Sequence, residues 1–308
     1  MDQDGVELAD SRARQARNWK LTLSYDGTDY HGWQIQPGLP TVQGELQAAL
    51  GRVTGEAPLP QGSGRTDAGV HALGQVASFV LAAGIPQENL MRALNRTLPA
   101  AIRILEARLV EAGFHARHST VAKTYEYRVF LERQGPGSGD GELRRNDGAD
   151  RPAASRSRKI CPPFLARYVY AYPWPLDLEE LQQAAGLFVG THDFLSFAAS
   201  DPDEAKREGI RDEDGEPASA VRTIFASRWE RRDTADGSLL AYQVRGEGFL
   251  HHMVRNLVGT MLDVGRGYRK PDEIPGMIAA RSRAAAGPTA PARGLFLHSV
   301  EYREATGQ

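Results

Sequence analysis

The sequence predicts an α+β fold made of two halves, each with the element order β-α-β-β-α-β. Alternating apolar and polar residues indicate strands, and apolar residues spaced three or four positions apart indicate helices. These patterns interleave in the same order twice along the 308 residues. Hydrophobic residues make up 41% of the chain and charged residues 25%, which is typical of a folded domain and excludes a wholly disordered chain.

The elements of the first half follow from local signals. They are, in order, a strand at 19–25, a helix over 42–53, a short strand before the glycine-rich segment at 62–69, a strand at 74–80, a helix from Pro86 and a strand at 102–109. Asp26-Gly27 marks the turn after the first strand. Thr41 is a suitable N-cap for the first helix, and Pro86 fits the first turn of the second.

The second half repeats the order less clearly. It contains a strand at 123–131, a helix at 177–189, strands near 193–198 or 221–231 and at 239–248, a helix at 250–264 and a strand near 295–303. Two such halves are ferredoxin-like. We expect one broad mixed, mostly antiparallel sheet, with helices on one side and an active-site cleft between the halves.

Composition divides the chain further. Residues 1–18 form a charged tail, 19–115 the N-terminal half and 116–305 the C-terminal half, which carries irregular insertions at 132–163 and 199–220. The net charge is −2, but acidic residues concentrate in 1–10 and 201–220, and the remainder carries +7. The folded part is therefore basic, so the overall charge does not exclude a polyanionic partner.

Other signals limit the compartment and the chemistry. No apolar run is long enough for a transmembrane helix, and the N-terminus lacks the apolar segment of a secretory signal, so we expect a cytoplasmic protein without membrane contact. Cys161 is the one cysteine of the chain, which excludes an intrachain disulfide and a thiolate zinc site.

The densest chemical signal is the glycine-rich segment 62–76, which combines Arg65, Asp67 and His71. It has neither the Gly-Lys-Ser/Thr of a phosphate-binding loop nor the third glycine of a dinucleotide fingerprint. Taken by spacing alone, it is equally compatible with a turn between strands in which Asp67 bonds to its own backbone.

The run Gly64-Arg65-Thr66-Asp67-Ala68-Gly69-Val70-His71-Ala72 resembles the catalytic motif of the tRNA pseudouridine synthase A (TruA) family. Further blocks resemble that family in the same order: Tyr25-Asp26-Gly27-Thr28 with Tyr30 and Gly32-Trp33-Gln34, Val42-Gln43-Gly44-Glu45-Leu46, Phe114-His115-Ala116-Arg117, Lys123-Thr124-Tyr125-Glu126-Tyr127, Gly190-Thr191-His192-Asp193-Phe194, Phe249 to Asn256, and Ala290-Pro291-Ala292 with Gly294-Leu295. The blocks span residues 19–303.

The resemblance implies an isomerase that converts uridine to pseudouridine at positions 38 to 40 of the tRNA anticodon stem-loop, without a cofactor or metal. It implies that Asp67 is the nucleophile, attacking either C6 of the uracil or C1′ of the ribose. Aspartate is ionised at neutral pH and needs no base to activate it. The pattern alone also allows Arg255 to be a solvated arginine, but the resemblance makes it the partner of Asp67.

Three further assignments follow from the resemblance, and a fourth, the lining of the pocket, rests on nearness in sequence to Asp67 and Arg255. Tyr125 stacks on the uracil and helps to remove the C5 proton, whereas we expect Tyr127 in the core. Arg65 helps to extrude the target nucleotide, which must leave its stem before it can react. Val70, Leu250 and Val254 are candidate residues lining a dry pocket. The family implies a homodimer that holds tRNA across both subunits.

Two other classes of function stay open. One is a non-catalytic RNA-binding protein on the same fold, and the other is an N-glycosidase or metal hydrolase. Histidines at 71, 115, 118, 251 and 252 are candidates for metal ligands, but their spacing matches no known zinc motif, so we expect structural or RNA-contacting roles.

Overall fold

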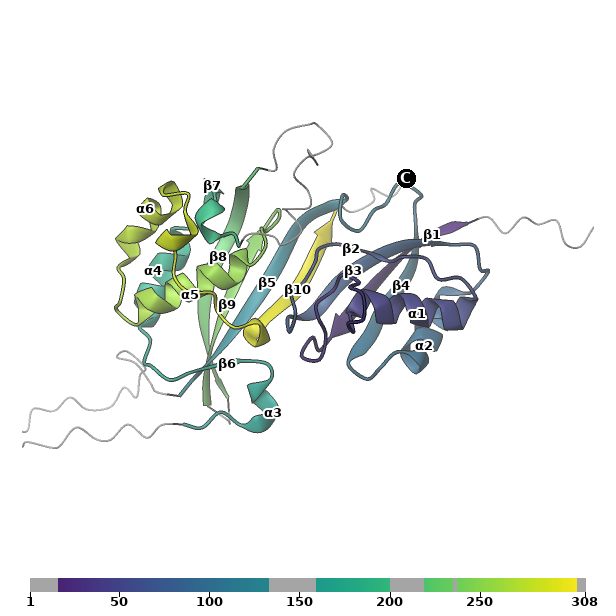
Figure 1. The fold of residues 1–308 in the computed structure, drawn as a ribbon, viewed down its shortest axis with the longest axis horizontal. Helices are drawn as coiled ribbons and strands as arrows, with labels where there is room; N and C mark the ends of the chain where they lie inside the picture. Colours follow the sequence, from purple (N-terminus) through teal and green to yellow (C-terminus); the bar gives the residue numbers. More distant parts are fainter. Residues whose placement is uncertain (1–15, 133–158, 200–218, 235–236, 304–308) are drawn as a thin grey trace, which may run out of the picture. The chain divides into compact units, whose positions relative to one another are not determined.

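A computed structural model describes residues 16–132, 159–199, 219–234 and 237–303. The predicted tail over 1–18 and the insertions at 132–163 and 199–220 lie largely outside these residues. The described residues form a mixed α+β fold with six α-helices and a large, mostly antiparallel sheet (Figure 1). The chain divides into two compact units, of which unit 1 contains Met1–Val121 and Leu297–Gln308, and unit 2 contains Ala122–Phe296.

Unit 1 confirms the element order predicted for the first half. Its elements are β1 (Arg17–Tyr25), α1 (Val42–Thr54), β2 (Gln61–Gly62), β3 (His71–Leu81), α2 (Gln87–Thr97) and β4 (Ile102–Val110). β1 pairs antiparallel with β3 on one side and β4 on the other, and β2 pairs antiparallel with β3. Because β2 runs directly into β3 through residues 63–70, the glycine-rich segment is the connection between paired strands.

The core of unit 1 follows from the alternation in β1, where Trp19, Leu21 and Leu23 are fully buried. α1 turns Leu46 and Leu50 into this core. The predicted cap is confirmed, since the Thr41 hydroxyl accepts the backbone N–H of Gly44 at 3.3 Å. α1 packs against α2, and α2 packs against β4, so both helices cover strands of the same unit.

Unit 2 has more elements than the second half was predicted to have. They are β5 (Thr120–Leu131, whose first residues belong to unit 1), α3 (Pro163–Ala166), β6 (Tyr170–Tyr172), α4 (Leu178–Gly186), β7 (Gly190–Asp193), η1 (Leu195–Phe197), β8 (Val221–Thr234), β9 (Gly237–Gly246), α5 (Met253–Gly265), η2 (Pro271–Glu273), α6 (Ile274–Ala279), η3 (Arg283–Ala285), η4 (Ala292–Gly294) and β10 (Leu295–Tyr302, which ends in unit 1). Antiparallel pairs give the order β5-β9-β8-β7, and β6 pairs parallel with β5.

The core of unit 2 lies between these strands and α5. Tyr127, Tyr242 and Trp229 are neighbours across β5, β9 and β8, and each is at most 2% exposed. The Trp229 indole N–H points to the sulfur of Met261 on α5, at 3.3 Å. α4 packs against both α5 and β8. The prediction that Tyr127 is a core residue is therefore confirmed.

Three predictions for the second half differ in detail from the structure. The order β-α-β-β-α-β is present as β5, α4, β8, β9, α5 and β10, but α3, β6, β7 and α6 are inserted between these elements. The helix predicted over 250–264 begins at Met253, because His252 has a left-handed φ of 58° that interrupts helical geometry. The helix predicted over 177–189 is shorter, since Asp177 is its N-cap and Gly186 its last residue.

The division between the units also differs from the expected boundary at 115/116. It falls at 121/122, and the chain returns to unit 1 for its last strand. The contacts of Tyr302 account for this return. Its hydroxyl donates to the Ala116 carbonyl at 2.7 Å, and its ring lies 4.9 Å from that of Phe114.

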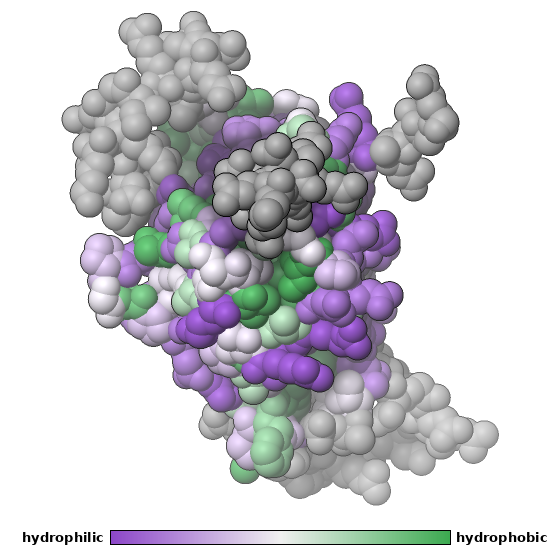
Figure 2. All heavy atoms as spheres, turned by 90° about the vertical axis from the view of Figure 1, so that its right-hand side faces the viewer, coloured by the Kyte–Doolittle hydropathy of each residue, from purple (hydrophilic) through white to green (hydrophobic). Residues whose placement is uncertain are grey.

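The surface in Figure 2 shows hydrophilic side chains around smaller hydrophobic patches on the face that it presents. None of the helices in the described part of the chain has the length and hydropathy that a membrane-spanning segment requires.

Candidate functional site

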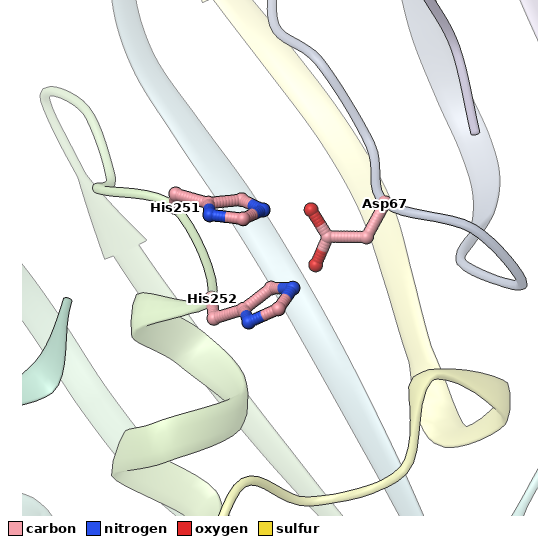
Figure 3. Close-up of side chains that lie close together, drawn as sticks. All are labelled: Asp67, His251 and His252. Atoms are coloured by element: carbon pink, nitrogen blue, oxygen red, sulfur yellow. The ribbon is translucent and has the colours of Figure 1, made fainter. Parts of the chain in front are cut away.

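The glycine-rich connection between β2 and β3 is an ordered loop in unit 1. It carries Arg65 exposed to solvent, Asp67 half-buried and Val70 buried. The backbone N–H of Val70 donates to the Asp67 carbonyl at 3.1 Å, and Gly69 adopts a left-handed φ of 75° within this turn. The side chain of Asp67 extends from the loop (Figure 3). A single short segment therefore presents both the carboxylate and the guanidinium.

Residues 26–33 form hydrogen bonds to this loop and pack against its backbone. The N–H of Trp33 donates to the Thr66 carbonyl at 3.0 Å, and the N–H of Gly69 donates to the Tyr30 carbonyl at 3.2 Å. A Cβ on Gly27 would lie 2.0 Å from the Val70 carbonyl oxygen, and Gly32, with φ of 84°, approaches Thr66 almost as closely. The two sequence motifs of this half thus form one structure, and their glycines allow the backbones to touch.

His71, the first residue of β3, also stabilises this arrangement. It is 1% exposed, and its Nδ1 accepts the backbone N–H of Gly27 at 3.1 Å. The same nitrogen lies 3.2 Å from a carboxylate oxygen of Asp26, which also accepts the N–H of Thr28. These contacts give His71 a structural role in joining the turn at Asp26-Gly27 to the loop that carries Asp67.

The remaining predicted residues belong to unit 2 and lie on β5 and in the segment 249–255. Tyr125 lies on β5 and is 8% exposed, and its ring meets that of Phe249 edge to face at 5.1 Å. Leu250, which follows Phe249, is half-buried, and Val254 on the first turn of α5 is buried. The fold thus brings Tyr125 beside the 249–255 segment. Phe249 belongs to the family-like block 249–256, but the sequence did not identify it as the neighbour of Tyr125.

Arg255 is half-buried and anchored. Its Nε donates to the Ala290 carbonyl at 2.8 Å, and the N–H of Ala290 donates back to the Arg255 carbonyl at 3.1 Å. The segment that contains Ala290 packs closely against α5. A Cβ added to Gly259 would lie only 1.6 Å from the Pro288 carbonyl oxygen. Arg255 is therefore not a fully solvated arginine, since its Nε is bonded to the Ala290 carbonyl.

Two histidine pairs, His115 with His118 and His251 with His252, each have their two rings in contact. The Nδ1 atom of His115 accepts the backbone N–H groups of Arg117 and His118, at 3.1 and 3.3 Å. Burial, followed by the charges of His118 and Arg117, lowers the pKa of His115. The rings of His251 and His252 stack 3.9 Å apart just before α5 (Figure 3). One ring nitrogen of His115 is thus already used to stabilise its own loop.

The predicted site residues fall into two groups. Arg65, Asp67 and Val70 share one loop of unit 1, whereas Tyr125, Leu250, Val254 and Arg255 belong to unit 2. Each group is held by contacts within its own unit, and the pairing of Asp67 with Arg255 stays a prediction.

Comparison with known proteins covers nearly the whole chain. A family model described as tRNA pseudouridine synthase matches residues 22–119 and 184–303. A tRNA pseudouridine synthase A of Solibacter usitatus is 46% identical over 286 residues, which cover 93% of this chain and 100% of that protein. Proteins with the same name from Moorella thermoacetica and Bacillus subtilis are 41% and 40% identical, and each match covers 92% of this chain and 98% of the relative.

Proposed function

The chain belongs to the tRNA pseudouridine synthase family, and from this premise we propose that it isomerises uridines 38 to 40 of the tRNA anticodon stem-loop, with Asp67 as the nucleophile. The observation that carries the proposal is the loop at 62–70, whose backbone is bonded to residues 30 and 33 while Arg65 and Asp67 extend from it. A fixed backbone beneath a single carboxylate suits an attacking group that must meet one atom of a flipped base.

The proposed reaction is balanced without a cofactor. The carboxylate of Asp67 attacks C6 of the uracil or C1′ of the ribose, and the bond between N1 and C1′ breaks. The uracil turns and C5 bonds to C1′. The bond to Asp67 breaks, either as C5 displaces the carboxylate from C1′ or by later elimination from C6, so the carboxylate is regenerated. The C5 proton leaves and N1 gains a proton. Product and substrate have the same composition, so the segment needs one nucleophile rather than the two carboxylates of a glycosidase.

The other residues have supporting roles in the proposal. Arg255 pairs with Asp67 and keeps it ionised when water is excluded. Its bond to the Ala290 carbonyl supports this role, because it orients the guanidinium. Tyr125 stacks on the uracil and helps to remove the C5 proton, a role that its ring contact with Phe249 supports by fixing its orientation.

Arg65 is proposed to assist the extrusion of the target nucleotide. Its exposure supports this role, since its planar guanidinium can occupy the space that the base leaves and recover part of the lost stacking. Val70, Leu250 and Val254 are proposed to line a dry pocket, in which the detached uracil recombines before water reaches the sugar.

The wider setting is also proposed. The two units are ferredoxin-like halves of one enzyme, and the order of elements in unit 1 supports this for the first of them. The protein acts in the cytoplasm as a homodimer that holds tRNA with both subunits. The net charge of +7 that remains without the acidic segments 1–10 and 201–220 supports the binding of a polyanion.

The test is carbodiimide-based mapping of pseudouridine in tRNA from a strain that lacks this gene, complemented with the wild type or with Asp67→Ala. We expect the wild type to restore the marks at positions 38 to 40 and the variant to restore none. Equal marks in both strains would refute the role of Asp67. Bound but unmodified tRNA with the wild type would favour a non-catalytic RNA-binding protein, and released uracil would favour a glycosidase.

A further inference from the structure

A buried polar network lies beneath the loop that carries Asp67. It consists of Tyr25 on β1, Ser63 and Thr66 in the loop, and Gln75 on β3, and each of these residues is at most 5% exposed. Four buried polar side chains at one place are unusual, because each is costly unless it is hydrogen-bonded. Here all four bond to one another or to the loop backbone.

The two ends of the Gln75 amide determine which groups in the network donate hydrogen bonds and which accept them. The side-chain oxygen of Gln75 accepts the backbone N–H of Val76 at 3.1 Å and the Ser63 hydroxyl at 2.7 Å. A backbone N–H can only donate, so this contact fixes which end of the Gln75 amide is the oxygen. The amide nitrogen therefore faces the Gly64 carbonyl at 2.9 Å and the Tyr25 hydroxyl at 3.4 Å, and donates to both.

The Tyr25 hydroxyl connects Gln75 to Thr66 in the loop. Since it accepts from Gln75, its one proton is directed to the Thr66 hydroxyl oxygen, 2.8 Å away. Burial raises the pKa of Tyr25 to about 12, so the hydroxyl keeps this proton at neutral pH. Gln75 thus fixes Gly64 directly and Thr66 through Tyr25. These two residues flank Arg65, and Thr66 immediately precedes Asp67.

We propose that Gln75 is a positioning residue for Asp67, which holds the loop in the geometry that the reaction needs. This inference rests on the proposed function of Asp67. The network is not needed to pair the strands, because the backbone of β2 already bonds to β3 at Gln61 and Gly62, and the N–H of Ser63 already donates to the Val76 carbonyl. The donors of Gln75 instead reach the loop and the tyrosine beneath it.

The experiment compares Gln75→Leu and Tyr25→Phe with the matched control Tyr242→Phe. Tyr242 is fully buried in unit 2, and its hydroxyl lies 2.8 Å from that of Ser227, so the control removes the same kind of bond elsewhere. Single-turnover formation of pseudouridine, the Kd for tRNA and the melting temperature are measured for each variant.

We expect Gln75→Leu to slow the single-turnover rate on the order of 100-fold and Tyr25→Phe roughly 10-fold, because small displacements of a reacting group are this costly. The Kd for tRNA should stay within about twofold. Tyr242→Phe should lower the melting temperature and leave the rate of the folded protein unchanged. A purely structural role for Gln75 would instead make its rate equal to that of the control.

A pH profile gives a second readout through Gln75→Glu. An ionised carboxylate retains the acceptor for Ser63 and Val76 but places a second oxygen against the Gly64 carbonyl and the Tyr25 hydroxyl. Protonation gives that oxygen one donor back, and burial favours the protonated form. The rate of Gln75→Glu relative to wild type should therefore rise as the pH is lowered, while the Tyr242→Phe ratio stays flat.

The inference is overturned if Tyr25→Phe and the folded Gln75 variants match the single-turnover rate of Tyr242→Phe. Should Gln75→Leu not fold, Tyr25→Phe decides the question, because it removes a single oxygen atom. A wild type that makes no pseudouridine would refute the proposed function instead, so the two failures are distinguishable.

Discussion

The loop of Asp67 in unit 1 and the strand of Tyr125 in unit 2 are held in place by different physical means. The loop is held mostly by uncharged groups, namely backbone amides and the side chains of Tyr25, Thr66 and Gln75, with the Asp26 carboxylate at its edge beside His71. Charges hold the strand, because Glu126, next to Tyr125, bonds to Arg128 at 2.7 Å and to Arg232 at 3.0 Å. The amide of Gln243 donates to the same carboxylate at 3.1 Å.

This difference matches two requirements of the proposed reaction. A loop that presents an ionised nucleophile benefits from neutral supports, because a charge beneath it would change its electrostatic surroundings. The ionic network lies one residue from Tyr125 along β5, and successive side chains point to opposite faces of a strand. The fold therefore places this ionic network on the face of β5 opposite to that of Tyr125.

Of the three variants that follow, the largest effect is expected from removing the charge of Arg255. In the variant Arg255→Gln the guanidinium and its bond to Ala290 are lost, so the single-turnover rate should fall on the order of 100-fold, as for a group that stabilises charge in the reaction. Arg231→Gln is the control, since Arg231 pairs with Asp233 on β8 and is expected to leave the rate unchanged. Rates that agree within a factor of three would exclude a role for Arg255.

A smaller effect, on stability, is expected at the contact that supports the loop. A methyl group on Gly27 would lie 2.0 Å from the Val70 carbonyl, so Gly27→Ala forces the two backbones apart and should cost about 3 kcal/mol. Gly84→Ala is the control, because nothing lies within 4 Å of its added Cβ. Urea denaturation of both variants provides the measurement, and equal midpoints would contradict the close packing of residues 26–33 on the loop.

The smallest effect concerns the ionic network and depends on pH. Burial acts to raise the pKa of Glu126, but the hydrogen bond and charge of Arg128, the hydrogen bond of Gln243 and the charge of Arg232 outweigh it and lower the pKa. A carboxylate with a lowered pKa in the folded state stabilises the protein above its unfolded pKa of about 4.3 and loses this contribution as the pH falls.

Glu126→Gln should therefore cost about 1–2 kcal/mol at pH 7 and progressively less below about pH 4. Glu230→Gln is the matched control, because Glu230 also bonds to Arg232 but is 53% exposed. Urea midpoints measured between pH 3 and 7 test this difference. A cost for Glu126→Gln that does not change over this range would show that the network does not depend on its charge.

The fold of unit 1 could be predicted because its signals are local. Alternation marks β1, Thr41 caps α1, and each element lies close in sequence to the next. The start of α5 could not be predicted in this way, since the sequence continues the helical pattern through Leu250 and only the left-handed backbone of His252 ends it. The added strand β6 depends on a parallel pairing with β5, which the local sequence does not encode.

The candidate residues could be found by motif, but not their supports. Tyr25 and Gln75 lie 50 positions apart, and Arg255 and Ala290 lie 35 apart, so no local pattern connects them. A weak signal was present at Gln75, which with Ser78 is one of two polar side chains in the largely apolar strand 74–80. Its partner atoms became identifiable only when the register of β1 with β3 was known.

The most direct test of the account is the single-turnover reaction of Asp67→Asn with a tRNA that carries uridine at positions 38 to 40. This change replaces one carboxylate oxygen with an amide of the same size, so the loop and the tRNA affinity should be retained. We predict an unchanged Kd for tRNA and no detectable pseudouridine. Product formed at the wild-type rate by this variant would contradict the central claim that the carboxylate of Asp67 performs the attack.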